Sequence, residues 1–107
     1  MPTFITIGYG DRDGYDRTDP SVRAGAHAHD DSLRADGVLI GIAGTPVQVR
    51  NHGAQRVEIS EGAFGRTDLP VAGFAVIEAD DMDAAIDLVG ATPCAVAYGV
   101  VEVWPLE

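Results

Sequence analysis

The segment 27–31, "HAHDD", holds the side chains of this sequence that are best suited to chemistry. A buried imidazole can act as a general acid or base near neutral pH. His29 lies at helical spacing from three apolar residues, Val22, Ala26 and Leu33, so we expect it on the inner face of a helix. His27 falls on a polar stripe and is expected to be solvated. We therefore predict His29 as the catalytic candidate; the alternative is a histidine satisfied by a backbone carbonyl at the core edge.

No metal site or cofactor is predicted. On a helix, residues two apart face nearly opposite directions, so only His27 and Asp31 could chelate together, and two ligands make a poor site. The segment 11–16, "DRDGYD", alternates acids like a calcium loop, but it lacks the third acid before the glycine and the closing glutamate. We expect it to be a solvated acidic loop. The segment 8–14, "GYGDRDG", misses the dinucleotide-binding spacing.

Cys94 is the only cysteine, so no intramolecular disulfide can form. Its neighbours in "ATPCAVA" are small and apolar, and no histidine lies near it in sequence, which predicts an inert, buried thiol. A single unpaired cysteine is typical of a reducing compartment. No basic leader and no long apolar run is present, so we predict a cytoplasmic protein.

The net charge of the chain limits the classes of partner that it can bind. The 107 residues carry 17 acids against 7 bases, all arginine, for a formal net charge of −10. Such a surface repels phosphate backbones and anionic lipids, so neither nucleic acid nor membrane is expected as a partner. The absence of lysine excludes a Schiff-base mechanism. The length predicts one domain, residues 1–107, whose ligand site would lie at an edge, in a cleft or between subunits.

Periodicity predicts an α+β fold. Expected strands are 3–9, 38–43, 72–79 and 98–106, with a hairpin at 47–50 and 56–60. Expected helices run from Thr18 or Asp19 to Gly37 and over 80–90. The order βαβ, hairpin, βαβ predicts a ferredoxin-like sheet with both helices on one face. The other face carries apolar residues, so we expect a homodimer that stacks sheet on sheet.

The segment 58–89, "EISEGAFGRTDLPVAGFAVIEADDMDAAIDLV", resembles the signature region of the YCII-related family in its DGPF type. The positions that fit are Gly62, Phe64, Thr67, Gly73, Phe74, Glu78 and Asp81. Segments 33–41 and 100–106 resemble the exit of the family's first helix and its closing strand. The resemblance implies a dimeric α/β barrel with a cleft between sheet and helices.

Three positions depart from that signature: Glu61 and Ala63 replace the Asp and Pro of the DGPF turn, and Arg66 stands where an acid is common. Some members have a proposed His–Asp catalytic pair. Here neither His27 nor His29 is in perfect register, and Thr92 occupies the expected Asp position. The resemblance therefore implies that the pair is incomplete, and whether the chain is an enzyme stays open.

A small-molecule pocket is the favoured functional reading. Tyr9, at the end of the first strand, should meet Phe64, Arg66 and Thr67 from the signature segment, with His29 nearby. An aromatic wall with one cation suits a small anionic or aromatic ligand, on which acid–base chemistry could act. Two alternatives remain: Phe64 plugs the barrel end, or the chain is a noncatalytic dimerisation domain that acts with another protein. Haem-dependent or cofactor-free oxidation would rest on fold analogy alone. The sequence does not name the ligand.

Overall fold

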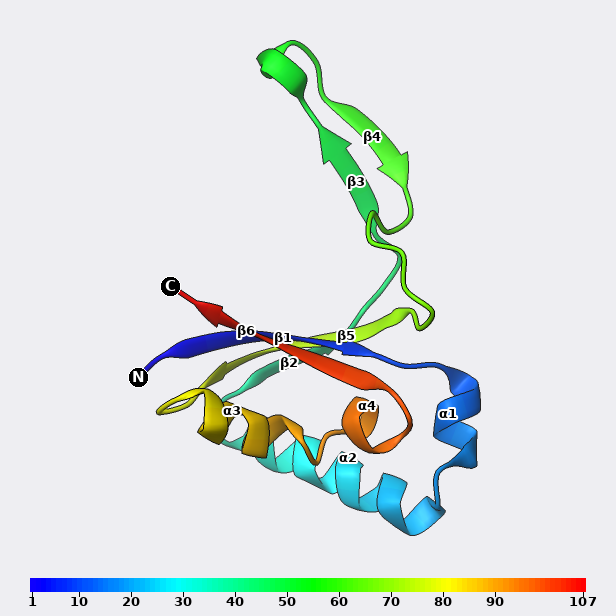
Figure 1. The fold of residues 1–107 in the computed structure, drawn as a ribbon, viewed down its shortest axis with the longest axis vertical. Coiled ribbons are helices and arrows are strands. Elements are labelled where there is room, and N and C mark those ends of the chain that lie inside the picture. The colour runs from blue at the N-terminus through cyan, green and yellow to red at the C-terminus, as the bar shows by residue number, and fades with distance from the viewer.

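A four-stranded antiparallel sheet forms the centre of the computed structural model, which describes residues 1–107 (Figure 1). Its strands are β1 (Thr3–Tyr9), β2 (Leu39–Ile42), β5 (Val71–Glu78) and β6 (Val100–Leu106), in the order β2-β5-β1-β6. The helices α2 (Pro20–Ala35), α3 (Met82–Val89) and α4 (Pro93–Val96) lie on one face of this sheet. This α+β arrangement is compatible with the predicted ferredoxin-like fold, and the four predicted strands are confirmed.

Alternation along β1 separates the two faces of the sheet. Phe4, Thr6 and Gly8 are buried on the helix side, and the residues between them point the other way. Phe4 packs with four further apolar residues from β5, from the residue that follows it and from α3 to form the core: Ile77, Ala79, Ala85 and Val89. The space between sheet and helices is therefore filled by side chains.

The two long helices begin where their capping residues predict. Asp19 accepts hydrogen bonds from the Ser21 backbone N–H (2.9 Å) and hydroxyl (2.7 Å), which lower its pKa, and Pro20 occupies the first turn of α2. Asp81 accepts a bond from the Ala84 N–H at 2.8 Å and starts α3. Gly37, with φ +91°, follows the end of α2 and takes the left-handed conformation that glycine favours. Both helix predictions are confirmed.

Two short helices were not expected. The predicted acidic loop contains α1 (Arg12–Arg17), whose first turn is capped by Asp11 accepting from the Gly14 N–H at 2.8 Å. Ion pairs four residues apart, such as Arg17 with Asp13 at 3.0 Å, line its surface. The spacing of acids that resembled a calcium loop thus belongs to a helix surface. The second is α4, which begins at Pro93 and carries Cys94 beside Gly8.

Residues 44–69, which we call the arm, leave the body of the molecule (Figure 1). Here β3 (Val47–Arg50) and β4 (Glu58–Glu61) pair as a separate two-stranded sheet, joined through the 3₁₀ turn η1 (His52–Ala54). The predicted hairpin is confirmed. It rises from the side of the central sheet that is opposite to the helices, so arm and sheet together form an L.

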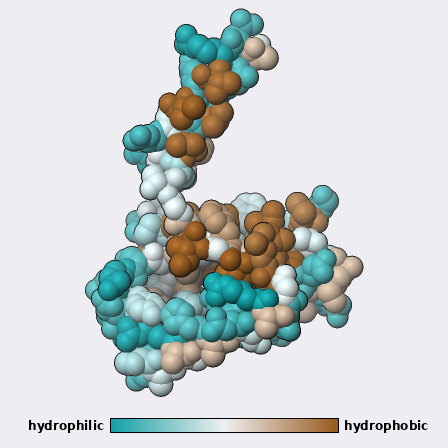
Figure 2. Space-filling view, turned by 180° about the vertical axis from the view of Figure 1, so that it is seen from behind, coloured by the Kyte–Doolittle hydropathy of each residue, from teal (hydrophilic) through white to brown (hydrophobic).

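The side of the sheet without helices, which we call the open face, is apolar and uncovered. Its exposed side chains include Ile5, Leu39, Phe74, Val76 and Trp104, and Trp104 is 56% exposed. Figure 2 shows apolar residues gathered on the body and again along the arm. The expected apolar face is thus present. No helix in the structure has the length and apolar character needed to cross a membrane.

Candidate functional site

A wide hollow of about 1230 Å³ lies at the inner corner of the L, between the arm and the open face. Tyr9 lines it from the end of β1, and Val71 and Phe74 line it from β5. The arm, with Ala43 just before it, contributes segments 43–50 and 62–67. The strand β1 ends at Tyr9 next to the start of β5, where the chain returns from the arm. Strand pairing therefore places the foot of the arm against Tyr9.

This hollow does not lie where the cleft was expected. The cleft was expected between sheet and helices, but that layer is the packed core around Ile77 and Ala85, which are 1% and 0% exposed. The hollow is on the opposite face.

Four of the five predicted site residues meet in this hollow: Tyr9, Phe64, Arg66 and Thr67. Phe64 is 79% exposed in the single chain, so nothing within this chain covers its ring. The Thr67 hydroxyl donates to the Leu69 carbonyl, so it is left with acceptor capacity for a ligand. These residues form one wall of an open recess.

Two guanidinium groups in the hollow have no carboxylate partner. Arg12, Arg17, Arg34 and Arg56 form ion pairs on the surface. Arg66 forms none, and Arg50 donates to the Gln48 side-chain carbonyl at 2.8 Å and lies over the Phe64 ring at 5.8 Å. None of the chain's 17 acids lines the hollow. In a chain of net charge −10, this corner is a local positive site.

Arg50 was not predicted, because its place depends on how the arm is held. Its position in an alternation of apolar and polar residues, "VQVR", does not by itself indicate a binding role.

Glu102 was also not predicted. It accepts a hydrogen bond from the Tyr9 hydroxyl at 2.5 Å, and this bond, with partial desolvation and the carboxylate charge, raises the Tyr9 pKa. An acid within the otherwise apolar strand "VVEVWPL" was the signal that could have found it.

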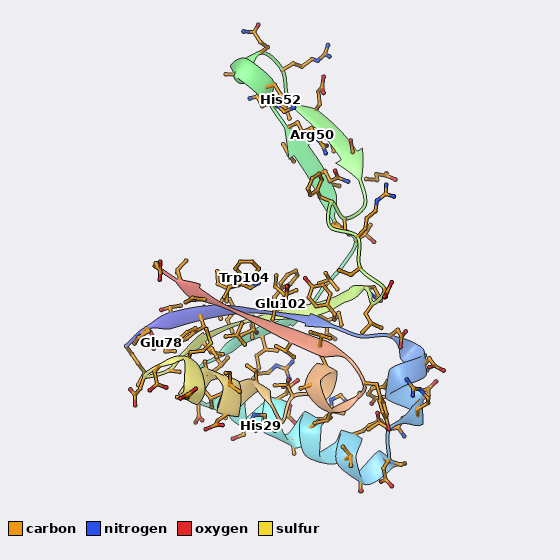
Figure 3. The ribbon with its side chains drawn as sticks, viewed as in Figure 1. His29, Arg50, His52, Glu78, Glu102 and Trp104 are labelled. Atoms are coloured by element: carbon orange, nitrogen blue, oxygen red, sulfur yellow. The ribbon has the colours of Figure 1, made fainter.

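His29 lies on the other side of the sheet, among the helices (Figure 3). Its Nε2 is 2.6 Å from the Leu88 carbonyl oxygen, and since a carbonyl only accepts, Nε2 carries the proton. The side chain is half-buried. This is the geometry of the structural alternative, a histidine satisfied by one backbone carbonyl. The predicted grouping of His29 with the four hollow residues is therefore wrong, because the sheet lies between them.

The incomplete His–Asp pair has a clear structural account. Thr92 uses its hydroxyl to donate to the Val89 carbonyl at 2.6 Å, where α3 gives way to α4. His27 is exposed, as predicted, and its Nε2 lies 2.9 Å from the Tyr15 hydroxyl. Neither histidine of segment 27–31 has a carboxylate hydrogen-bonded to its ring. No acid–base pair of that kind is present.

Cys94 lies half-buried between α4 and Gly8. Burial raises the pKa of its thiol, and the nearby Asp30 carboxylate raises it further. Desolvation also raises the Asp30 pKa. A thiol with a raised pKa is a poor nucleophile at neutral pH, which agrees with the inert role expected from the sequence.

One comparison with known proteins identifies the chain. A family model described as the YCII-related domain matches residues 3–107, essentially the whole length. The predicted membership of the YCII-related family is thereby confirmed. A search of curated proteins finds no match.

Proposed function

The chain belongs to the YCII-related domain family, and from that premise we propose that it is a homodimeric binding protein for a small anion with an aromatic or apolar body. The observation that carries this proposal is the composition of the hollow. It combines the two unpaired guanidinium groups of Arg50 and Arg66 with the aromatic rings of Tyr9, Phe64 and Phe74, and no acid lines it. Arginine binds carboxylate and phosphate groups through paired N–H donors.

The exposed area supports the dimer. The chain exposes 7356 Å², whereas a compact monomer of 11.2 kDa is expected to expose about 5700 Å². The excess, roughly 1700 Å² per chain, matches what each subunit of an obligate homodimer buries. The open face, with its exposed Trp104 and Phe74, is the natural surface for sheet-on-sheet stacking in a dimeric α/β barrel.

A dimer also makes the hollow a better site. At about 1230 Å³ and open to solvent, the hollow is larger than the roughly 300–1,000 Å³ usual for small ligands. A second subunit on the open face would narrow it and exclude water from Arg66. Because burial strengthens charge-assisted hydrogen bonds, binding and dimerisation are expected to support each other.

Binding is better supported than acid–base catalysis. The residues that line the hollow include no histidine, aspartate, glutamate or cysteine. His29, the catalytic candidate from the sequence, lies on the helix side of the sheet, where its ring is hydrogen-bonded to the Leu88 carbonyl. The second candidate function, a noncatalytic dimerisation domain that acts with another protein, is favoured by the large uncovered apolar surface. For either role we propose the cytoplasm as the location, since the one cysteine has no partner.

Three ligands that share one ring but differ in charge test the proposal: benzoate, benzyl alcohol and benzylamine. Titration of the ¹⁵N-labelled protein should shift the amides of Tyr9, Arg66 and Thr67 with benzoate, less with the alcohol, and not with the amine. Arg66→Gln should weaken benzoate binding about fivefold, because a partly solvated ion pair contributes about 1 kcal/mol. His29→Ala is the matched control and should bind as the unmodified protein does.

The outcomes separate the candidate functions. Equal shifts with all three ligands would mean that the ring alone is recognised and would remove the anion from the proposal. No shift in the hollow with any ligand would favour the interaction domain. Loss of benzoate binding in His29→Ala, with Arg66→Gln unaffected, would return the site to the helix side of the sheet.

A further inference from the structure

The two faces of the arm differ in what they contact. In the β3–β4 pairing, Val49 stands opposite Ile59, and Val47 lies two residues away on the same face. With Val57 they make what we call the valine face of the arm, and each is 57–67% exposed. Figure 2 shows this apolar stripe running up the arm. Glu61 stands opposite Val47 at the base of this face, and the other face carries Gln48, Arg50, Glu58 and Ser60.

The polar face of the arm is covered from within the chain, and the valine face is not. Gln48 donates from Nε2 to the Gly62 carbonyl at 3.3 Å, and the Arg50 guanidinium lies over the Phe64 ring. Segment 62–66 thus folds back on the polar side. An isolated two-stranded hairpin is marginally stable in water, so an arm whose apolar face stays bare requires a cover.

We infer that the cover is a second copy of this chain: the valine face of each arm packs on the partner subunit and closes the partner-facing side of the hollow. This inference rests on the proposed homodimer. The arm rises on the same side as the open face (Figure 1), so any body seated on the open face lies beside the arm. Under two-fold symmetry, each arm then holds the other subunit in the same way.

Charge favours the same occupant. Segment 44–69 carries three arginines and three acids, so the whole net charge of −10 resides on the rest of the chain. Two copies repel each other least where they meet through the neutral arm and the apolar open face. A basic partner protein would instead be drawn to the acidic helices on the far side. The surface that is free of net charge is the one suited to self-association.

The anion site is then incomplete in one chain. The hollow has one wall on the sheet, which includes Tyr9, and one wall on the arm, which includes Phe64. The side between these two walls is open to solvent. A partner held by both arm and open face supplies the remaining wall. The arm therefore links dimerisation to the binding site and is more than a surface insertion.

Neighbouring residues on β4 give a matched pair of variants. Ile59→Glu places a carboxylate on the valine face, and Ser60→Glu places the same charge on the opposite face, outside the hollow lining. Analytical ultracentrifugation should find the unmodified protein and Ser60→Glu as dimers at micromolar concentration. Ile59→Glu should weaken the dimer at least about a hundredfold, because it buries an unpaired carboxylate at two places per dimer. Far-UV circular dichroism checks that both variants fold.

The results distinguish the two proposals. A monomeric unmodified protein would overturn the homodimer and the arm inference together. A dimeric Ile59→Glu protein would overturn the arm inference and leave the sheet-stacked dimer standing. If Ile59→Glu unfolds, hydrogen exchange on the unmodified protein decides: β3 and β4 amides should be protected in the dimer and lose protection on dilution. Unprotected arm amides in a dimeric sample would show that the partner does not cover the arm.

Discussion

At the scale of single residues, Tyr9 provides the most direct probe of the hollow. Its hydroxyl donates to Glu102 across β1 and β6, and this bond raises its pKa. A tyrosine with a raised pKa favours the folded state while it is neutral, so this contribution is present below the ordinary pKa of about 10 and is lost as pH rises through the folded value. Glu102→Gln should bring the Tyr9 pKa back toward the ordinary value.

The Tyr9 titration can be followed by NMR of ¹³C-labelled tyrosine, which separates the three tyrosines of the chain. The Tyr15→Phe variant serves as a control, since the Tyr15 hydroxyl lies on α1 and is paired with His27. An unchanged Tyr9 titration in Glu102→Gln would mean that the hydrogen bond is not formed in solution. The orientation of the Tyr9 ring in the hollow would then lose its support.

Gly8 tests the packing of α4 on the sheet. A Cβ added at Gly8 would lie 2.9 Å from Cys94 Sγ, closer than such atoms normally approach. Gly8→Ala should therefore destabilise the fold by about 1–3 kcal/mol, as overpacking does. Cys94→Ala removes the sulfur, so the double variant should recover most of that loss, and denaturant unfolding of all four proteins measures the coupling. Strictly additive effects would contradict the contact between Gly8 and Cys94.

At the scale of elements, the sequence predicts what is encoded locally. The starts of α2 and α3 follow from Asp19 and Asp81, whose side chains bond the backbone two or three residues on. Strand alternation in "TFITIGY" predicts which β1 residues are buried. The short helix α1 was missed because its six residues include Gly14, a poor helix former, and its apolar spacing is too brief to show a period.

The direction of the arm could not be predicted, and this explains the errors at the site. The hairpin pattern of Val47, Val49, Val57 and Ile59 is readable in sequence, but whether it lies over the helices or over the open face is a tertiary property. Because the arm lies over the open face, Phe64, Arg66 and Thr67 line the same hollow as Tyr9, and His29 lies on the other side of the sheet. The signature segment thus lines the hollow, whereas the layer in which the cleft was expected holds the packed core.

At the scale of the whole molecule, shape departs from that of a compact domain. The radius of gyration is 15.7 Å, against about 13 Å expected for this length, and only 12 of 107 residues are buried. The projecting arm and the uncovered open face account for both departures. A fold with so little internal core gains stability when these surfaces are covered, which links folding to association.

The proposed association would have to overcome charge repulsion, and this gives the last prediction. Two chains of net charge −10, each 51 Å long, repel over distances that salt controls. The screening length falls from about 30 Å at about 0.01 M salt to about 10 Å at about 0.1 M. If apolar surfaces hold the dimer, its dissociation constant should therefore fall several-fold over this range, as sedimentation equilibrium can measure.

The matched control lowers the charge without touching the proposed interface. Asp83 and Asp87 are exposed on α3, on the helix side of the sheet. The double variant Asp83→Asn, Asp87→Asn should dimerise more tightly at low salt and respond less to added salt, because less repulsion is left to screen. A dimer that weakens as salt is added would point instead to intersubunit ion pairs. Arg50 and Arg66 would then be contacts to the partner's acids, and the anion site would have to be abandoned.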